Sequence, residues 1–189
     1  MELLSGVFSA FGLSASAGLN AYIPLLIVSL VAKFTDLINL KAPWDTLTSW
    51  WVIGAIVVLG TVEFFADKIP AVNHVNDIIQ SFVRPAAGAI VFAANADVLT
   101  DISPILSMVA GLFVAGSVHT VKSIAVRPAL TAATAGAANT PVSIAEDVVS
   151  TFLSILAILI PIIIGIILVL LVTTFIWWRW RKANAKQAI

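Results

Sequence analysis

The chain has 189 residues, of which 60% are hydrophobic and 11% are charged, and its ten basic side chains balance its ten acidic ones. A soluble domain carries about a quarter charged residues, so this composition and a mean hydropathy of +1.07 indicate an integral membrane protein. Zero net charge gives no electrostatic reason to bind nucleic acid, and the lack of cysteine excludes disulfides and thiolate chemistry. We predict one membrane domain over residues 1–189.

Four stretches are apolar over roughly the 20 residues that a helix needs to cross a bilayer. They cover about residues 4–32, 50–66, 102–121 and 148–178. The last is longer than necessary, so we expect it to tilt or to kink at Pro161. It ends in "WWRWRKANAK", where tryptophans are followed by basic residues. The positive-inside bias therefore predicts a basic cytoplasmic tail at residues 179–189, and four crossings place the N-terminus on the same side.

The first stretch contains "GLSASAGLNAYIP", in which Gly12 and Ser16, and Ser14 and Gly18, are four residues apart. Small residues at this spacing favour close helix contact, within one chain or between copies. Asn20 lies at depth in the same stretch. It is a candidate for a polar lining, and an ordinary interhelical hydrogen bond is the alternative.

Between the second and third stretches, residues 71–85 read "AVNHVNDIIQSFVRP". The apolar residues recur at helical spacing and the polar ones take the other face, which predicts an amphipathic helix. We expect it to lie in the membrane interface. Packing under another part of the same protein is the alternative.

A short motif occurs twice, as "VRPAAGAIVFAAN" from Val83 and as "VRPALTAATAGAAN" from Val126, and it uses two of the four arginines. Residues 86–98 and 129–141 are too short or too weakly apolar to span upright, so we predict two Arg-Pro-led re-entrant segments. With four crossings these segments enter from opposite faces, and the halves at about residues 50–98 and 102–145 form an inverted repeat. Six crossings would make the repeat parallel. A further alternative is that Pro and Arg mark helix starts at an interface.

Polar residues within or beside the spanning stretches are functional candidates. Glu63 and Asp67 share a helix face, as do His119 and Lys122, and an Arg-Pro element follows each pair. The arginines could bind a carboxylate or phosphate, and Glu63 and His119 could relay protons. Ion pairs that only fix helix register are the alternative. The candidate pathway residues are Asn20, Glu63, Asp67, Lys68, Arg84, Asn95, His119, Lys122, Arg127 and Asn139.

The stretch "SIAED" before the last span predicts a helix start, with Ser143 and Glu146 as a capping box and Asp147 beside the helix dipole. The chain has no Gly-x-Ser-x-Gly, no His-Glu-x-x-His and no P-loop. Its two histidines cannot form a His-rich metal site, although His74 with Asp77 and Glu63 is a conceivable ligand set. We expect no metal and no cofactor.

The motifs "GLNAYIPLL", "VEFFADKIPAVNHVND", "RPAAGA", "HTVKSIAVRP" and "SIAEDVVS" occur in this order along nearly the whole chain. Together they resemble a family of bacterial membrane proteins known as domain of unknown function 4126. The resemblance implies an integral membrane protein of about this size, which we expect in the bacterial inner membrane. It implies no activity, substrate or catalytic residue.

Three functions remain open from the sequence. The first is a small transporter or channel for an anionic solute or a lipid phosphate head group, in which the opposed re-entrant segments form the site. The second is a non-catalytic membrane scaffold or accessory subunit. The third is a lipid-acting membrane enzyme, which requires Glu63, Asp67 and His119 to converge. The expected partners are the lipid bilayer and further copies of the chain, because so small a protein encloses little interior.

Overall fold

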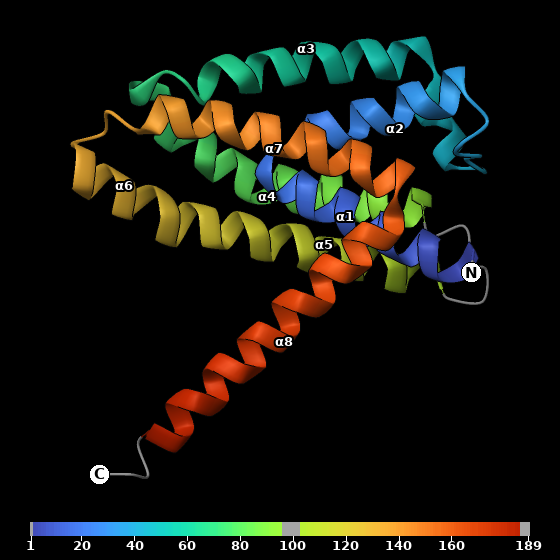
Figure 1. Ribbon diagram of the computed structural model, residues 1–189. Helices are drawn as coiled ribbons and strands as arrows, with labels where there is room; N and C mark the ends of the chain where they lie inside the picture. The colour runs from blue at the N-terminus through green and yellow to red at the C-terminus, as the bar shows by residue number, and fades with distance from the viewer. Residues whose placement is uncertain (1, 96–102, 186–189) are drawn as a thin grey trace.

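The computed structural model describes residues 2–95 and 103–185, and every regular element in these ranges is helical (Figure 1). In chain order the elements are α1 (Glu2–Leu19), α2 (Tyr22–Phe34), the 3-10 helix η1 (Trp44–Thr48), α3 (Trp50–Ala66), α4 (Pro70–Asn95), α5 (Pro104–Thr120), the π-helix η3 (Val121–Val126), α6 (Arg127–Thr134), α7 (Asn139–Leu159) and α8 (Pro161–Ala185).

Four helices are long and apolar enough to cross a membrane: Asn76–Asn95, Pro104–Thr134, Asn139–Leu159 and Pro161–Lys182. The prediction of an all-helical integral membrane protein with four candidate spans is therefore confirmed. The positions of the spans differ from the prediction. Residues 148–178 divide at Ile160 into α7 and α8, and α8 then leaves the bundle (Figure 1). The missing N–H of Pro161 explains why the helix breaks at this point.

Residues 4–32, expected as one crossing, form a helical hairpin. In Figure 1, α1 runs through the middle of the bundle, and α2 returns toward the end where the chain begins. Asn20 makes the turn, because its Oδ1 accepts hydrogen bonds from the backbone N–H groups of Tyr22 and Ile23 at 3.0 and 3.1 Å. This side chain caps the start of α2 and so permits the helix to break within an apolar stretch.

The two Arg-Pro elements lie inside long helices instead of opening re-entrant segments. The helix α4 continues through Pro85 to Asn95, and α5, η3 and α6 follow one another without interruption from Pro104 to Thr134. Residues 96–98 of the first predicted segment lie outside the described residues. Each arginine has ion-pair partners within the protein, so its charge does not have to mark the end of a span. The inverted repeat stays a prediction.

The predicted amphipathic helix is the first part of α4, and its faces are opposite to those expected at an interface. Gln80 and Arg84 on the polar face are buried, whereas Ile78, Ile79 and Phe82 on the apolar face are exposed. In a membrane the apolar face can meet lipid while the polar face is satisfied within the protein. Packing against the same chain, the alternative named from the sequence, describes this helix correctly.

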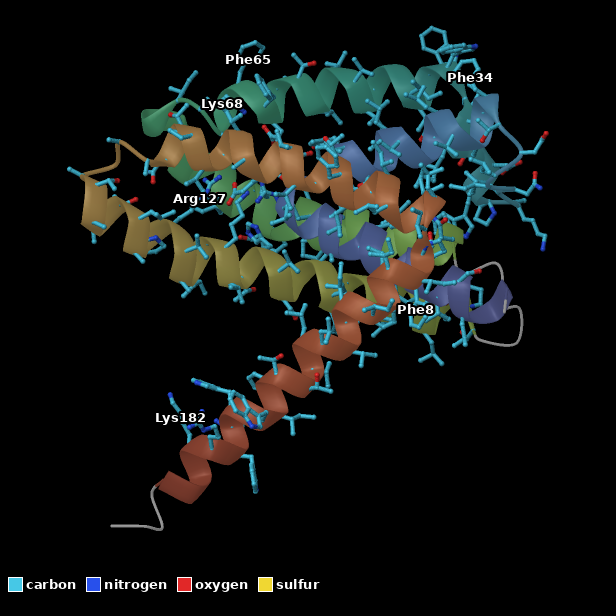
Figure 2. The ribbon with its side chains drawn as sticks, in the orientation of Figure 1. Phe8, Phe34, Phe65, Lys68, Arg127 and Lys182 are labelled. Atoms are coloured by element: carbon cyan, nitrogen blue, oxygen red, sulfur yellow. The ribbon has the colours of Figure 1, made fainter. Side chains whose placement is uncertain are left out.

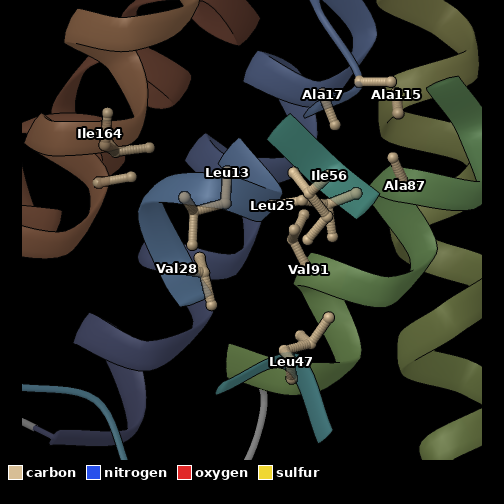
Figure 3. Close-up of a cluster of buried hydrophobic side chains, with 13 residues drawn as sticks. Leu13, Ala17, Leu25, Val28, Leu47, Ile56, Ala87, Val91, Ala115 and Ile164 are labelled. Carbon is tan, nitrogen blue, oxygen red and sulfur yellow. The ribbon is translucent and has the colours of Figure 1, made fainter. Parts of the chain in front are cut away.

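Small side chains let α1 pack closely at the centre of the bundle. Ser14 Oγ donates to the carbonyl oxygen of Gly88 on α4 at 2.9 Å. Ser16 Oγ lies 2.7 Å from Ser150 Oγ on α7. The small-residue stripe of α1 is thus used within one chain. Figure 3 shows the apolar core beside it, where Leu13 and Val91 are buried.

Gly88 of α4 and Gly111 of α5 are in contact where these two helices cross. A Cβ built at Gly88 would lie 2.8 Å from the carbonyl oxygen of Gly111, whereas one at Gly54 would meet nothing within 4 Å. We expect Gly88→Ala to lower the free energy of unfolding by about 1–3 kcal/mol through overpacking. The matched substitution Gly54→Ala should be neutral or stabilise the helix by about 0.5–1 kcal/mol. Chemical unfolding in detergent micelles measures both, and equal effects would contradict this packing.

Candidate functional site

Nine charged side chains gather beyond the tip of the α1–α2 hairpin: ion pairs join seven of them, and the other two form a neighbouring pair. Five of the nine residues are buried and the rest are partly buried. The nine come from the end of α3, from α4, η3, α6 and α7, and two of them, Lys68 and Arg127, are labelled in Figure 2. The four cations are Lys68, Arg84, Lys122 and Arg127, and the five carboxylates are Glu63, Asp67, Asp77, Glu146 and Asp147. We call this set the ion-pair network.

Asp67 is the centre of the network. Its Oδ2 lies 3.3 Å from Arg84 Nη2 and 3.2 Å from Arg127 Nη2, and its Oδ1 accepts a hydrogen bond of 2.7 Å from Asn76. Burial raises the pKa of Asp67, but Arg84, Lys122 and Arg127 outweigh burial and hold that pKa below its ordinary value. The two Arg-Pro elements therefore meet on one ionised carboxylate.

Arg84 is fully buried, and its guanidinium contacts Glu63 on one side and His119 on the other. Its Nη2 and Nε donate to Glu63 Oε1 at 2.8 and 3.2 Å, and its Nη1 lies 3.3 Å from His119 Nδ1. A guanidinium has no acceptor, so Nδ1 must accept and the imidazole proton must be on Nε2. That nitrogen faces Ser81 Oγ at 3.2 Å. The geometry thus defines His119 as a neutral imidazole.

Two hydrogen bonds to members of the network hold the tip of the hairpin. Lys122 in the π-helix η3 donates to the carbonyl oxygen of Leu19 at 3.0 Å, and it pairs with Glu146 at 2.7 Å. The cation lies at the negative end of the α1 dipole, where it is stabilising. Asn20 Nδ2 donates to Asp147 Oδ1 at 2.9 Å. The hairpin is therefore connected to the network through one backbone carbonyl and one amide.

Asp147 also binds Lys68, at 2.8 Å, and Arg127 joins Asp77 to Glu146. Arg127 donates from Nη1 to both carboxylate oxygens of Asp77, at 3.1 and 3.2 Å. These contacts connect α4, α6 and α7 around the end of α3.

The capping box predicted at Ser143 and Glu146 is wrong, because α7 already begins at Asn139. Ser143 lies 3.5 Å from Asp67, and Glu146 and Asp147 belong to the network. A sequence signal for this face exists. Ser143, Glu146 or Asp147, Ser150 and Ser154 recur at intervals of three or four, as one polar stripe of a helix.

Two of the predicted site residues lie elsewhere. Asn95 donates to the carbonyl oxygen of Val91 near the end of α4, at 3.1 Å. Asn139 accepts from Thr131 at 3.1 Å on an exposed part of the protein. The Ala-Ala-Asn endings of the repeated motif therefore do not contribute to the network. The other predicted residues do come together there or contact it: Asn20, Glu63, Asp67, Lys68, Arg84, His119, Lys122 and Arg127.

Two cavities border the network. One of about 510 Å³ lies between η3 and α7, and its lining is apolar except for Ser117, Lys122 and Glu146. Another of about 670 Å³ lies between α4 and α5, where Ser81 and His119 contribute to its wall. Lys122 and Glu146 of the network line the first cavity, and His119, which contacts Arg84 of the network, lines the second.

The chain belongs to a family of unknown function. The family model described as Domain of unknown function (DUF4126) matches residues 7–181, which is most of the chain. No curated protein and no solved structure matches the chain.

We expect Asp67→Asn to destabilise the protein by about 3–5 kcal/mol, because it leaves two buried guanidinium groups without their shared counter-charge. The matched control is Asp36→Asn in the exposed loop after α2, which should change the free energy of unfolding by less than about 0.5 kcal/mol. Denaturant titration in micelles measures the difference. Equal stabilities of the two variants would show that the network contributes no more than surface charge.

Proposed function

We propose that the protein is a small membrane transporter for an amphiphile with an anionic head group, such as a lipid phosphate. The observation that carries this proposal is the cavity between η3 and α7. Its wall is apolar except for one serine and the Lys122–Glu146 pair. An apolar wall suits a hydrocarbon chain, and a cation at one side suits an anionic head group.

Lys122 is a better partner for an anion than the two arginines considered from the sequence. The guanidinium groups of Arg84 and Arg127 are already bound by carboxylates of the chain. The lysine ammonium is a point charge on a flexible stem, so it can exchange one anionic partner for another. A head group that replaces Glu146 at Lys122 would keep the number of ion pairs constant.

Ligand binding at Lys122 would also act on the hairpin. The same ammonium group holds the carbonyl oxygen of Leu19 at the tip, at 3.0 Å. A ligand that draws Lys122 toward the cavity competes with this contact and favours a state in which the tip is released. A broken helix whose ends meet ions near the substrate is a recurring arrangement in transporters. If the ligand binds more tightly when the tip is released than when the tip is held, ligand binding increases the population of the released state.

We place the transporter in the bacterial cytoplasmic membrane with the C-terminus inside. The basic side chains at the end of α8, Arg179, Arg181 and Lys182, support this orientation. We also propose that the chain works as a homo-oligomer. The α8 helix departs from the bundle and leaves most of its length available to lipid or to another copy (Figure 1).

One observation favours a lipid-acting enzyme as the second candidate. Glu63, Asp67 and His119 converge on Arg84, as that function would require. The three groups are nevertheless engaged with Arg84, and both ring nitrogens of His119 have partners. The transport proposal rests on the cavity beside Lys122 and does not require these three groups to leave Arg84, so we prefer it.

The transport proposal is tested with proteoliposomes that contain fluorescent phosphatidylglycerol and an impermeant quencher added outside. We expect the protein to expose inner-leaflet lipid to the quencher faster than protein-free vesicles do. Lys122→Met should return the rate to that of protein-free vesicles, whereas Lys182→Met, an exposed lysine on α8, should leave it unchanged.

The unfolding midpoint of each variant in micelles separates loss of transport from loss of fold. Lys122→Arg keeps the positive charge and should retain part of the flux even if Lys122→Met unfolds. Unchanged flux in a folded Lys122→Met protein would overturn the role of this cavity. The appearance of hydrolysed lipid in the vesicles would favour the enzyme instead.

A further inference from the structure

Two buried acceptors in the described part of the chain have no hydrogen-bond donor. They are Glu63 Oε2 and Gln80 Oε1, in residues that are 2% and 3% exposed. Gln80 lies one turn before Arg84 on the buried polar face of α4, and Glu63 pairs with Arg84 through its other oxygen, Oε1. A buried acceptor without a donor is expensive, and nearly all such atoms in native proteins are satisfied. A donor is therefore needed at this place.

The charges of the network show a matching imbalance. Among the side chains that the structure describes, its five carboxylates exceed its four cations by one. A net charge buried in a low-dielectric interior is unfavourable, and a titratable group there tends to neutralise. One added proton would bring the network to four carboxylates and four cations.

Glu63 is the least compensated of the five carboxylates. It contacts one cation, through one of its two oxygens. The others meet more than one donor residue or are bound through both oxygens, as the contacts of Asp67, Asp77, Glu146 and Asp147 show. The Glu63 side chain is also the most buried, with 1% of its surface exposed against 22% for Asp77. Of the five carboxylates, Glu63 is therefore the one that would bind the added proton.

We propose that Glu63 is a proton-binding site and carries a proton on Oε2 in the folded protein. The protonated oxygen donates to Gln80 Oε1, while the carbonyl oxygen Oε1 of Glu63 accepts from Arg84. This arrangement satisfies both unpartnered atoms and removes the excess charge with a single proton. It needs no group other than those the chain provides.

The affinity of Glu63 for a proton depends on the positions of the charged and polar groups around it. Burial raises the pKa of Glu63, Arg84 on α4 and Lys122 in η3 act to lower that pKa, and Asp67 at the end of α3 acts to raise it. Tyr22 at the start of α2 also interacts with Glu63, and neutral His119 on α5 lies on the far side of Arg84. A shift of Lys122 or of the hairpin would therefore change the affinity of Glu63 for its proton.

The evidence for the proton site is independent of the transport proposal, because it rests on hydrogen bonds and charge alone. In a transporter, Glu63 would be the coupling site. Its proton and the ligand would be linked through Lys122, which interacts with both Glu63 and the wall of the cavity.

Infrared spectroscopy of the protein at neutral pH, in a detergent without ester or carboxyl groups, tests the assignment directly. A protonated carboxylic acid has a carbonyl stretching band above the amide bands, where carboxylates do not absorb. We expect this band in the unchanged protein and in the control Asp147→Asn, and we expect Glu63→Gln to remove it. The absence of the band from the unchanged protein, or its persistence in Glu63→Gln, would overturn the proposal.

A stability measurement gives a second, separate readout. Glu63→Gln places a neutral donor where the proton is proposed, so its unfolding midpoint at neutral pH should stay close to that of the unchanged protein. Asp67→Asn should lower the midpoint clearly. A similar loss in both variants would mean that Glu63 is ionised. A midpoint that rises with sodium concentration and depends on Glu63 would show a bound cation, and it would also overturn the proposal. Neither readout depends on lipid flux.

Discussion

The requirement that buried charges be paired determines how this bundle is assembled. Asp67 follows α3, and its carboxylate meets arginines from α4 and α6 and lies near Lys122 in η3. Removing these groups from water is costly unless each has partners with good geometry. The helices that carry the partners are therefore fixed relative to one another at this end. A second requirement is that side chains be small where helices cross closely. Gly88 and Gly111 meet this requirement and fix α4 against α5.

The ends of the α1–α2 hairpin obtain their hydrogen-bond partners from this network. A helix that stops within an apolar environment leaves carbonyl groups without partners at its end, and the next helix leaves N–H groups. Lys122 binds the Leu19 carbonyl at the end of α1, and Asn20 caps α2 while it donates to Asp147. The helix ends and the charged groups thus satisfy each other. Any movement of the hairpin must exchange these bonds for others.

The sequence predicted the class of protein and most of the site, but it did not predict the path of the chain. Hydropathy identifies apolar stretches, and it cannot distinguish a crossing from a hairpin when a single residue, Asn20, supplies the caps. It also treats an arginine as the end of a span, although Arg84 lies within α4 because Glu63 and Asp67 neutralise it. The polar face of α4 was recognised from its period, but the period alone does not say which face meets lipid. Glu146 and Asp147 were assigned to a helix start because the beginning of α7 at Asn139 has no strong apolar signal.

The repeated Val-Arg-Pro-Ala motif has a structural explanation that does not require re-entrant segments. Each copy places an arginine within a long helix, and the two helices bring the guanidinium groups to within 3.3 Å of one oxygen of Asp67. Arg84 also forms an ion pair with Glu63, and Arg127 also forms ion pairs with Asp77 and Glu146. The two copies thus share an acceptor but differ in their second partners. Arg127 meets carboxylates that are close to the outside, whereas Arg84 meets one that is wholly enclosed. That asymmetry is why an excess negative charge is tolerable near Arg127 and requires a proton beside Arg84.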